Sequence, residues 1–553
     1  MKIRSGFAEN LTRLYKNRVF SALLLVASAS LTALTLIFEW LSVFAFVSLV
    51  PLVIALVRRC EAGKKPFSSY KTIFLWSLVF YIIIYHWFWY LWPMDFLGVE
   101  KPMALVITIV CHLGLSLLQS VGTAFVGPLF CAAYKKGKMK FAALIFASAW
   151  TLLEYAQSLT WAGVPWARLA LSQTAFPAAV QSASLLGSLF IGSIIAIVNG
   201  FAATAVIFFV REGYRSKAFL RCSAFALTII LLNLGYGFFA LGIHNEKSGE
   251  EVRVNVIQGN IGSGDKWADN SDINSLRVYE KITREAHAQS NADIVLWPET
   301  VLVNAVKGSS YYRGRITSLA RETGSVIFVG AFDSTENEYG DYKEYNAVIA
   351  FFPDGSVEES SYKKRHLVPF GEYMPMRNIL EKLLPFMTEL NMLADDLTPG
   401  ESAEIIETGY GKAGRLICFD SIYAALARDS VAQGAEYILL STNDSWYRDS
   451  ASAYQHNAHA ILRAVENRRY IARSASTGIS SVISSEGKTT DMLPPLVDGY
   501  ICASIYTNTQ RTLYSYVGDV IVLPCAVILM FFMIFDLYEK KKRIKTFDIT
   551  EKE

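Results

Sequence analysis

Charged side chains are scarce in this chain. Asp, Glu, Lys and Arg together make up 18% of its 553 residues, whereas hydrophobic residues make up 52%. This balance excludes a wholly water-soluble protein, because so few charged groups cannot cover so much apolar surface. The net charge of +3 is also small, and the basic residues cluster in short loops beside apolar runs. We therefore expect no nucleic-acid partner, since such proteins gather positive charge along one face or groove.

Cysteines with metal-binding or disulfide spacing are also missing. The seven cysteines include no CxxC pair, and five of them lie in or beside apolar segments. This pattern is neither a disulfide framework nor a zinc site. His456 and His459 could share one face of a predicted helix, as metal ligands often do, but they lack a matching third ligand. We therefore expect no metal ion and no cofactor.

Long apolar runs take the place of charge. A bilayer core about 30 Å thick requires roughly 20 apolar residues in a helix. We predict a membrane domain over residues 1–243 with seven transmembrane helices, an eighth helix over 517–538 and a basic cytoplasmic tail over 539–553. Residues 244–516 have the composition of a water-soluble globular domain. The eight apolar runs lie near residues 19–38, 40–57, 72–92, 103–133, 141–160, 180–210, 218–243 and 517–537.

Lys and Arg are concentrated in alternate loops. Clusters of them occur at the N-terminus, after the second, fourth and sixth apolar runs, and in the C-terminal tail. The intervening short loops have almost none. Because cytoplasmic loops of membrane proteins are rich in Lys and Arg, this alternation predicts eight crossings with both termini in the cytoplasm. The domain over 244–516 is then extracytoplasmic.

Aromatic residues cluster near the predicted outer boundary of the membrane. Trp87, Trp89, Tyr90 and Trp92 precede an acidic loop that contains proline, and Trp166 lies in another outer loop. The simplest interpretation is an interfacial aromatic belt. The alternative is that these rings shape a path for lipid, which makes Trp166 a candidate substrate-binding residue.

The soluble region alternates predicted strands with predicted helices. The strands are short apolar runs bounded by Gly, Pro, Asn or Asp. Apolar strands buried between layers of helices predict an α/β sandwich. The main strands are predicted at 252–260, 292–299, 325–332, 346–352, 414–419 and 437–442, and the helices at 272–290, 311–323 and 453–468.

Three reactive side chains stand out in this region. Glu299 follows a predicted buried strand, Cys418 ends a predicted strand just before a predicted helix, and Lys364 lies in the loop YKKRHLVPFGEYMP. Considered singly, Glu299 fits a helix cap at the surface, Cys418 a small residue of the core and Lys364 a solvated charge. Together, they supply a nucleophilic thiol, a base for its proton and a cation for an oxyanion. At a helix N-terminus, we expect the helix dipole to favour the thiolate of Cys418.

Longer motifs extend around these residues. They are WPET, KRHLVPFGEYMP, LICFDSIY, TNDSWYRDSASAYQHNAHAILRAVENRRYIARSASTGIS, QGNI…KW at 258–267 and GVPWARLALSQ at 163–173. Together they resemble the nitrilase superfamily and, more narrowly, the bacterial apolipoprotein N-acyltransferase family. The resemblance implies an αββα sandwich of the nitrilase type. It also implies that Glu299 is a general base, Lys364 a transition-state stabiliser and Cys418 the nucleophile.

The resemblance extends to supporting residues. It implies that Glu372 supports the lysine and that Trp267 lies near the substrate cleft. Phe419 and Asp420 follow the cysteine where Tyr-Glu is frequent in the family. Asp420 keeps the negative charge on a side chain that is one methylene shorter, whereas Phe419 has no hydroxyl group to donate.

A reaction also follows from the resemblance. An acyl chain would move from a membrane phospholipid, through a thioester on the cysteine, to the α-amine of the N-terminal diacylglyceryl-cysteine of an apolipoprotein. This is the last step of lipoprotein maturation. The partners would be phospholipid and apolipoprotein, and the location would be the bacterial cytoplasmic (inner) membrane, with the catalytic domain on the periplasmic side. We expect a monomer.

Residues 384–400, LPFMTELNMLADDLTPG, carry apolar side chains outside the predicted strands. Phe386 and Met387 are candidate substrate-binding residues, because exposed apolar side chains here would dip into the membrane surface and guide acyl chains. The alternative is a helix packed on the domain's own core.

Two other functions fit parts of the sequence. A membrane-bound carbon–nitrogen hydrolase (amidase) acting on small amides would share Glu299, Lys364 and Cys418, although eight crossings exceed what a tether needs. An inactive scaffold or a transporter would not need these three residues. The crossings are also poor in charged residues, which transport sites often require.

Overall fold

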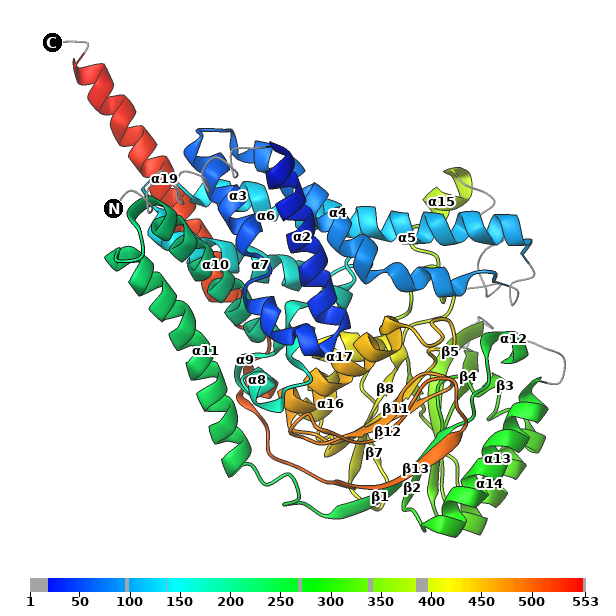
Figure 1. The fold of residues 1–553 in the computed structure, drawn as a ribbon. Helices are drawn as coiled ribbons and strands as arrows, with labels where there is room; N and C mark the ends of the chain where they lie inside the picture. The colour runs from blue at the N-terminus through cyan, green and yellow to red at the C-terminus, as the bar shows by residue number, and fades with distance from the viewer. Residues whose placement is uncertain are drawn as a thin grey trace. The chain divides into compact units, whose positions relative to one another are not determined.

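The chain divides into two compact units, of which the computed structural model describes residues 18–94, 99–135, 137–266, 271–336, 342–383 and 396–550. The first unit comprises residues 1–86, 111–240 and 519–553, and the second comprises 87–110 and 241–518. Long helices dominate the first unit, and the strands belong to the second (Figure 1).

Seven helices among the described residues are long and apolar enough to cross a membrane. They confirm the predicted multi-pass helical domain. The run at 141–160 differs from the others, because it contains α7 (Ala142–Ala156), which has only 15 residues. A helix of that length extends about 22 Å, less than the roughly 30 Å of a bilayer core. The seven candidate spans are Val19–Ile37, Glu39–Glu61, Pro66–Ile84, Lys101–Ala133, Ser188–Glu212, Lys217–Ile243 and Val522–Lys541.

Helices of the first unit pack closely around α7. It contacts α10 (Ser188–Glu212) and α19 (Val522–Thr550) along much of its length. On α10, the buried Asn199 amide donates to the Ala45 carbonyl at 2.8 Å and accepts from the Leu49 amide at 2.8 Å. These bonds satisfy backbone groups at a break between helices, which water cannot reach. The other helices that lie wholly or partly in this unit include α2 (Arg18–Ile37), α3 (Val50–Glu61), α4 (Tyr70–Ile84), α5 (Lys101–Thr123), α6 (Val126–Ala133) and α11 (Lys217–Ile243).

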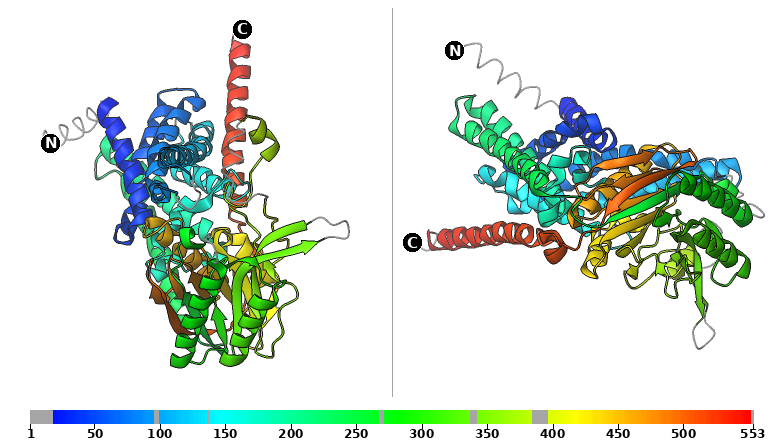
Figure 2. Two further views of the ribbon diagram at one scale, coloured as in Figure 1. Left: turned by 90° about the vertical axis from the view of Figure 1, so that its right-hand side faces the viewer. Right: turned by 90° about the horizontal axis from the view of Figure 1, so that it is seen from below.

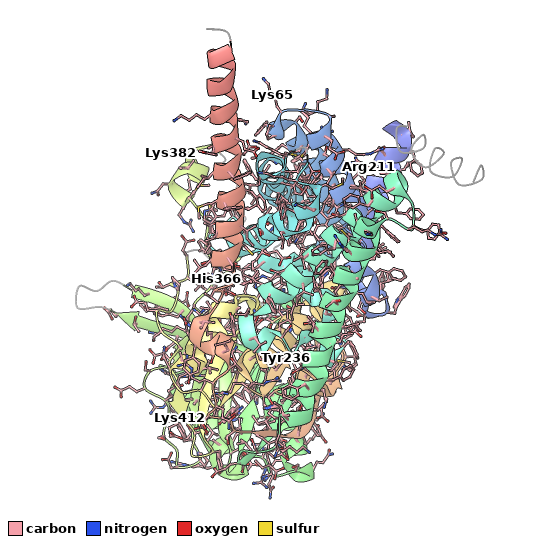
Figure 3. All side chains as sticks on the ribbon, turned by 90° about the vertical axis from the view of Figure 1, so that its left-hand side faces the viewer. Lys65, Arg211, Tyr236, His366, Lys382 and Lys412 are labelled. Atoms are coloured by element: carbon pink, nitrogen blue, oxygen red, sulfur yellow. The ribbon has the colours of Figure 1, made fainter. Side chains whose placement is uncertain are left out.

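Two basic residues that are far apart in the sequence lie at the same end of the first unit. Lys65 follows α3 and Arg211 lies in the last turn of α10, and Figure 3 shows both at the same end. The Arg211 guanidinium pairs there with Glu61, the last residue of α3. Which side of a membrane this end faces stays a prediction.

Two β-sheets form the centre of the second unit. One has the order β13-β1-β2-β4-β5-β6, with β3 paired to β4, and the other has the order β12-β11-β10-β9-β8-β7. Strands β1, β2 and β4 run parallel, as do β8, β9 and β10. The strands are β1 (Glu251–Gln258), β2 (Ile294–Leu296), β3 (Leu302–Ala305), β4 (Val326–Glu336), β5 (Tyr342–Phe351), β6 (Tyr362–Lys363), β7 (Ile406–Glu407), β8 (Lys412–Ile417), β9 (Tyr437–Thr442), β10 (Ile471–Ala475), β11 (Ser480–Ile483), β12 (Thr489–Leu493) and β13 (Gly499–Tyr506).

The sheets pack face to face, with helices on their outer faces. Side chains alternate between the two faces of each strand, so every strand contributes to two hydrophobic layers. Helices α13 (Ser271–Gln289) and α14 (Ser310–Thr323) cover the first sheet, and α16 (Ala424–Ala432) and α17 (Ala451–Asn467) cover the second (Figure 1 and Figure 2). The predicted αββα sandwich is therefore confirmed. The layer between the sheets includes Val254, Leu296, Phe328, Ile417, Leu439 and Ala472.

Candidate active site

Cys418 lies in a strained turn at the carboxyl end of a central strand. It follows β8 directly and opens the short 3₁₀ helix η9 (Cys418–Ile422). Its φ of 47° is in the left-handed region, which a side chain with a Cβ rarely adopts. Such strain persists only where the surroundings hold it, and it concentrates at functional sites. The residue stays partly exposed, so a substrate can reach it.

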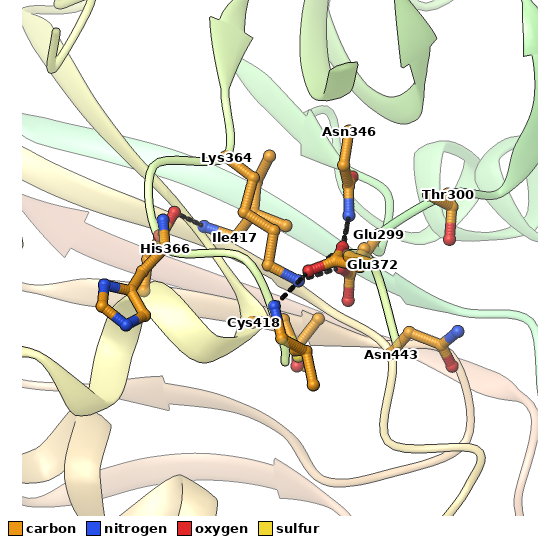
Figure 4. Close-up of polar contacts among 12 residues, drawn as sticks. Glu299, Thr300, Asn346, Lys364, His366, Glu372, Ile417, Cys418 and Asn443 are labelled. Atoms are coloured by element: carbon orange, nitrogen blue, oxygen red, sulfur yellow. Dashed lines mark hydrogen bonds and ion pairs between the residues drawn. The ribbon is translucent and has the colours of Figure 1, made fainter. Parts of the chain in front are cut away.

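The Lys364 ammonium lies between two carboxylates. Its Nζ atom is 2.9 Å from Glu299 Oε1 and 2.9 Å from Glu372 Oε1. The Asn346 amide nitrogen donates to the same two oxygens, at 2.7 and 2.8 Å. Figure 4 shows the three charged groups converging, with Cys418 alongside. The sequence prediction thus assembled residues that the fold does bring together, and Asn346 is a member that it missed.

Burial and charge set the protonation of this cluster. Burial lowers the pKa of Lys364, but the charges of Glu299 and Glu372 outweigh that effect and hold it well above its ordinary value. The pKa of the Cys418 thiol is raised, first by burial and then by the Glu299 carboxylate, against the opposing effect of Lys364. The expectation that a helix dipole would favour the thiolate is therefore wrong. The five-residue η9 is too short to offset that burial and the nearby carboxylate.

A glycine on β4 makes room for the backbone of Glu299. A Cβ atom on Gly330 would lie 2.1 Å from the Pro298 carbonyl oxygen and 2.7 Å from the Glu299 Cα atom. The Val301 amide donates to the Gly330 carbonyl at 2.7 Å. Thr300, between them, has a φ of 45°. Glu299 is thus held by a tight backbone turn against β4.

Asp420 forms hydrogen bonds both to the segment around Lys364 and to the strand end that precedes Cys418. One carboxylate oxygen accepts hydrogen bonds from the Ile417 amide at 3.0 Å and the Tyr362 hydroxyl at 2.8 Å, and the other accepts from the His366 amide at 2.8 Å. Burial raises its pKa to about 6, against the lowering effects of Lys364 and these donors. The structure therefore gives Asp420 a place between the two loops.

Phe419 and His366 both pack against the ring of Tyr423. The His366 ring stacks on Tyr423 with the ring centroids 3.5 Å apart, and Phe419 meets Tyr423 edge-on at 5.6 Å. Burial, together with the charge of Lys364, lowers the pKa of His366 to about 4. His366 is therefore a neutral packing residue at neutral pH.

Lys266 is a second buried lysine near the site. Its ammonium donates to the Thr300 hydroxyl, and Thr300 follows Glu299 in the chain. Burial lowers its pKa to about 8, and the charges of Glu299, Lys364 and Cys418 also act on it. Lys266 lies in the QGNI…KW motif directly before Trp267, so this motif is the sequence feature that could have indicated Lys266 as well as Trp267.

The predicted substrate-binding residues are not tested by this geometry. Trp267, Phe386 and Met387 lie outside the described residues. Trp166 is buried in the short helix η6 (Pro165–Ala167) of the first unit, and its role stays a prediction. Trp87, assigned to an aromatic belt from the sequence, belongs to the second unit and meets Tyr447 edge-on at 4.6 Å.

One cluster has metal-ligating residue types. Ligand atoms of Cys418, Asp444 and His456 lie within 4.8 Å of one another. The Asp444 carboxylate, however, already pairs with His456 Nδ1 at 2.8 Å and with the Arg473 guanidinium at 2.6 Å. A guanidinium buried on the carboxylate opposes a further cation, so these residues form a protein network.

Two family models match separate parts of the chain. The model described as the apolipoprotein N-acyltransferase N-terminal domain matches residues 21–201. The model described as carbon-nitrogen hydrolase matches residues 253–513. The first match lies in the membrane helices and the second contains Glu299, Lys364, Glu372 and Cys418.

Curated relatives are similar over nearly the whole length of the chain. An apolipoprotein N-acyltransferase of Geobacter metallireducens is 29% identical, over 91% of this chain and 92% of that one. Apolipoprotein N-acyltransferase 1 of Treponema denticola is 25% identical, over 91% and 93%. The Gloeobacter violaceus apolipoprotein N-acyltransferase is 29% identical, over 86% of each chain. With both family models matched in order, the chain belongs to the apolipoprotein N-acyltransferase family.

Proposed function

We propose that this enzyme moves an acyl chain from a membrane phospholipid to the α-amine of the N-terminal diacylglyceryl-cysteine of lipoproteins. The proposal is carried by one observation: a buried lysine between two carboxylates lies beside a strained cysteine, in a chain with seven apolar helices among its described residues. The site supplies acyl-transfer chemistry, and the helices suit two substrates that are both held in a bilayer.

Acylation of the enzyme is the first half of the proposed cycle. Glu299 takes the proton of the Cys418 thiol, and the sulfur attacks the ester carbonyl carbon of the phospholipid. The Lys364 ammonium stabilises the resulting oxyanion. The intermediate then collapses: the ester C–O bond breaks, the leaving alkoxide takes the proton from Glu299, and a lysophospholipid departs. An acyl thioester on Cys418 remains.

Geometry explains why Glu299 can accept that proton. When Glu299 becomes neutral, Lys364 still has Glu372 at 2.9 Å as its counter-ion. Asn346 continues to hold both carboxyl groups in place. Because the raised pKa of Cys418 leaves the resting thiol protonated, a base that is already in position is needed for each turnover.

Transfer to the acceptor is the second half. The neutral α-amine of the diacylglyceryl-cysteine attacks the thioester carbonyl, and Glu299 takes a proton from the nitrogen. The C–S bond breaks, and the departing thiolate recovers the proton from Glu299. The product is an N-acyl amide, and the free thiol is regenerated. Water must be kept from the thioester, because hydrolysis would waste the acyl group.

Membrane orientation is part of the proposal. The clustered Lys and Arg residues favour an arrangement with both termini in the cytoplasm and the catalytic domain outside. In a cell with two membranes, the catalytic domain would face the periplasm from the inner membrane. A lipoprotein anchored in the outer leaflet would then meet the site without leaving the bilayer.

An intact-mass experiment tests the proposed reaction. Purified full-length enzyme in detergent is mixed with phospholipid, and wild type is compared with Cys418→Ser. We expect one acyl group on the wild type that neutral hydroxylamine removes, and that passes to a diacylglyceryl-cysteine peptide. Absence of any acyl adduct, with ammonia released from small amides, would refute the proposal in favour of an amidase.

A further inference from the structure

Behind the nucleophile lies a charged network that the proposed mechanism does not use. Asp444 follows β9, His456 lies on α17 and Arg473 lies on β10, and all three side chains are buried. Asp444 pairs with His456 at 2.8 Å and with Arg473 at 2.6 Å. Gly478 closes the site so tightly that a Cβ atom there would lie 2.3 Å from Asp444 Oδ2. The three elements therefore hold this network rigidly.

The His456 ring connects the network to Cys418. Its Nε2 atom is 3.1 Å from the Cys418 carbonyl oxygen and 3.0 Å from the Ser421 hydroxyl. Because the Ser421 hydroxyl itself donates to that carbonyl, at 2.8 Å, Nε2 faces two acceptors and must carry a hydrogen. The contact is made to the strained residue itself, whose φ is 47°.

The other ring nitrogen also faces an acceptor. Nδ1 lies 2.8 Å from Asp444 Oδ1 and 3.4 Å from an Arg473 guanidinium nitrogen. The same guanidinium pairs with the other Asp444 oxygen at 2.6 Å, which favours the ionised carboxylate. The shorter contact of Nδ1, to that carboxylate, is a hydrogen bond only when Nδ1 carries a hydrogen, and a ring with hydrogens on both nitrogens is an imidazolium. With one carboxylate and two cations, the network has a net positive charge.

We propose that His456 is a positioning residue for the reaction, held as an imidazolium by Asp444 and Arg473. It fixes the carbonyl group of Cys418, which stabilises the left-handed turn that presents the sulfur. Its charge also favours the thiolate over the thiol, because its ligand nitrogen lies within 4.8 Å of the sulfur. The ring keeps both its protons throughout, and Glu299 remains the base.

Other charges around the sulfur define the background for this effect. Glu299 and Asp444 oppose the thiolate, and Lys364 favours it. Lys266 also interacts with Cys418. Replacing His456 with glutamine, a neutral residue of comparable size, leaves the Glu299, Lys364 and Lys266 side chains in place. It also removes a charge that lowers the pKa of Asp444, and any protonation of Asp444 would favour the thiolate and reduce the expected shift.

The test is the pH dependence of Cys418 alkylation by iodoacetamide in the full-length enzyme, followed by peptide mass. In His456→Gln, we expect the midpoint of the pH profile to rise by about one unit and the rate at pH 7 to fall about tenfold. Ser421→Ala is the matched control, because it removes a contact to the same carbonyl without removing a charge. Its midpoint should equal that of wild type.

Two results would overturn the proposal: an unshifted midpoint in His456→Gln, or an equal shift in Ser421→Ala. If His456→Gln does not fold, His456→Asn is judged by the same measurement, since it also removes the ring and its charge while Asp444 and Arg473 stay in place. The inference rests on Cys418 as the proposed nucleophile. Alkylation needs no lipid, however, so failure of the acyl transfer and failure of this proposal remain distinguishable.

Discussion

Replacing Glu372 with glutamine tests whether Glu372 serves as the counter-ion of Lys364 while Glu299 acts as the base. The Glu372 carboxylate accepts from Lys364 at 2.9 Å, from Asn346 at 2.8 Å and from the Val368 amide at 2.7 Å. Glutamine has nearly the same shape but no charge, and it turns an NH₂ group toward one of these donors. Lys364 then has Glu299 as its sole charged partner in the cluster.

The rate of acylation should fall sharply in this variant. Protonation of Glu299 would leave the buried Lys364 ammonium without a carboxylate partner in the cluster, whereas in wild type Glu372 remains. A hydrogen bond to a charged group contributes about 1.5–3 kcal/mol. Loss of about 2–3 kcal/mol at the transition state corresponds to a rate that is roughly 30- to 150-fold lower.

Single-turnover acylation, followed by intact mass at saturating phospholipid, measures that rate directly. Glu358→Gln is the matched control, because Glu358 is also buried against a cation, with Arg415 at 2.6 Å, but lies outside the site. Both variants should lose thermal stability, yet Glu358→Gln should acylate within about twofold of the wild-type rate. The reasoning fails if Glu372→Gln acylates normally, or if both variants slow equally.

Three further predictions concern single positions. Asp420 has a folded pKa of about 6, above its ordinary 3.8, so the folded state binds more protons between about pH 4 and pH 6. The free energy of unfolding of wild type should therefore exceed that of Asp420→Asn most below about pH 4, and this difference should shrink by up to about 3 kcal/mol as the pH rises through 6. A difference that stays constant with pH in denaturation experiments would contradict this prediction. Gly330→Ala should displace Glu299 and lower the acylation rate at least about tenfold. Its control is Gly314→Ala, in open space on α14, which should be neutral or slightly stabilising. Equal effects of the two variants in activity and melting assays would contradict the close contact between Gly330 and the backbone of Glu299. Lys266→Met should keep or raise the melting temperature, because the substitution removes a buried charge. The same variant should acylate about tenfold more slowly than wild type. Acylation at the wild-type rate would show that Lys266 has no role in the reaction.

Much of the architecture follows from local patterns that a sequence displays openly. Apolar runs of about 20 residues predict membrane helices whatever their neighbours, because the bilayer sets the required length. Short apolar strands that alternate with charged helices predict the layered domain, and β1, α13 and α14 lie within two residues of their predicted bounds. The chemistry of Glu299, Lys364 and Cys418 could be assembled from residue types and motifs alone.

Tertiary structure decided what depends on distance and burial. Lys364 lies 65 positions from Glu299 in sequence, and only the paired strands bring Asn346 to both carboxylates. Local reasoning about a helix dipole predicted a thiolate at Cys418, yet the surrounding protein and Glu299 raise its pKa. The buried link from Arg473 through Asp444 and His456 to Cys418 joins β10, β9 and α17, and no short motif reveals it. Residue types are local properties of a chain, but electrostatic energies depend on separations in space, which only the folded backbone sets.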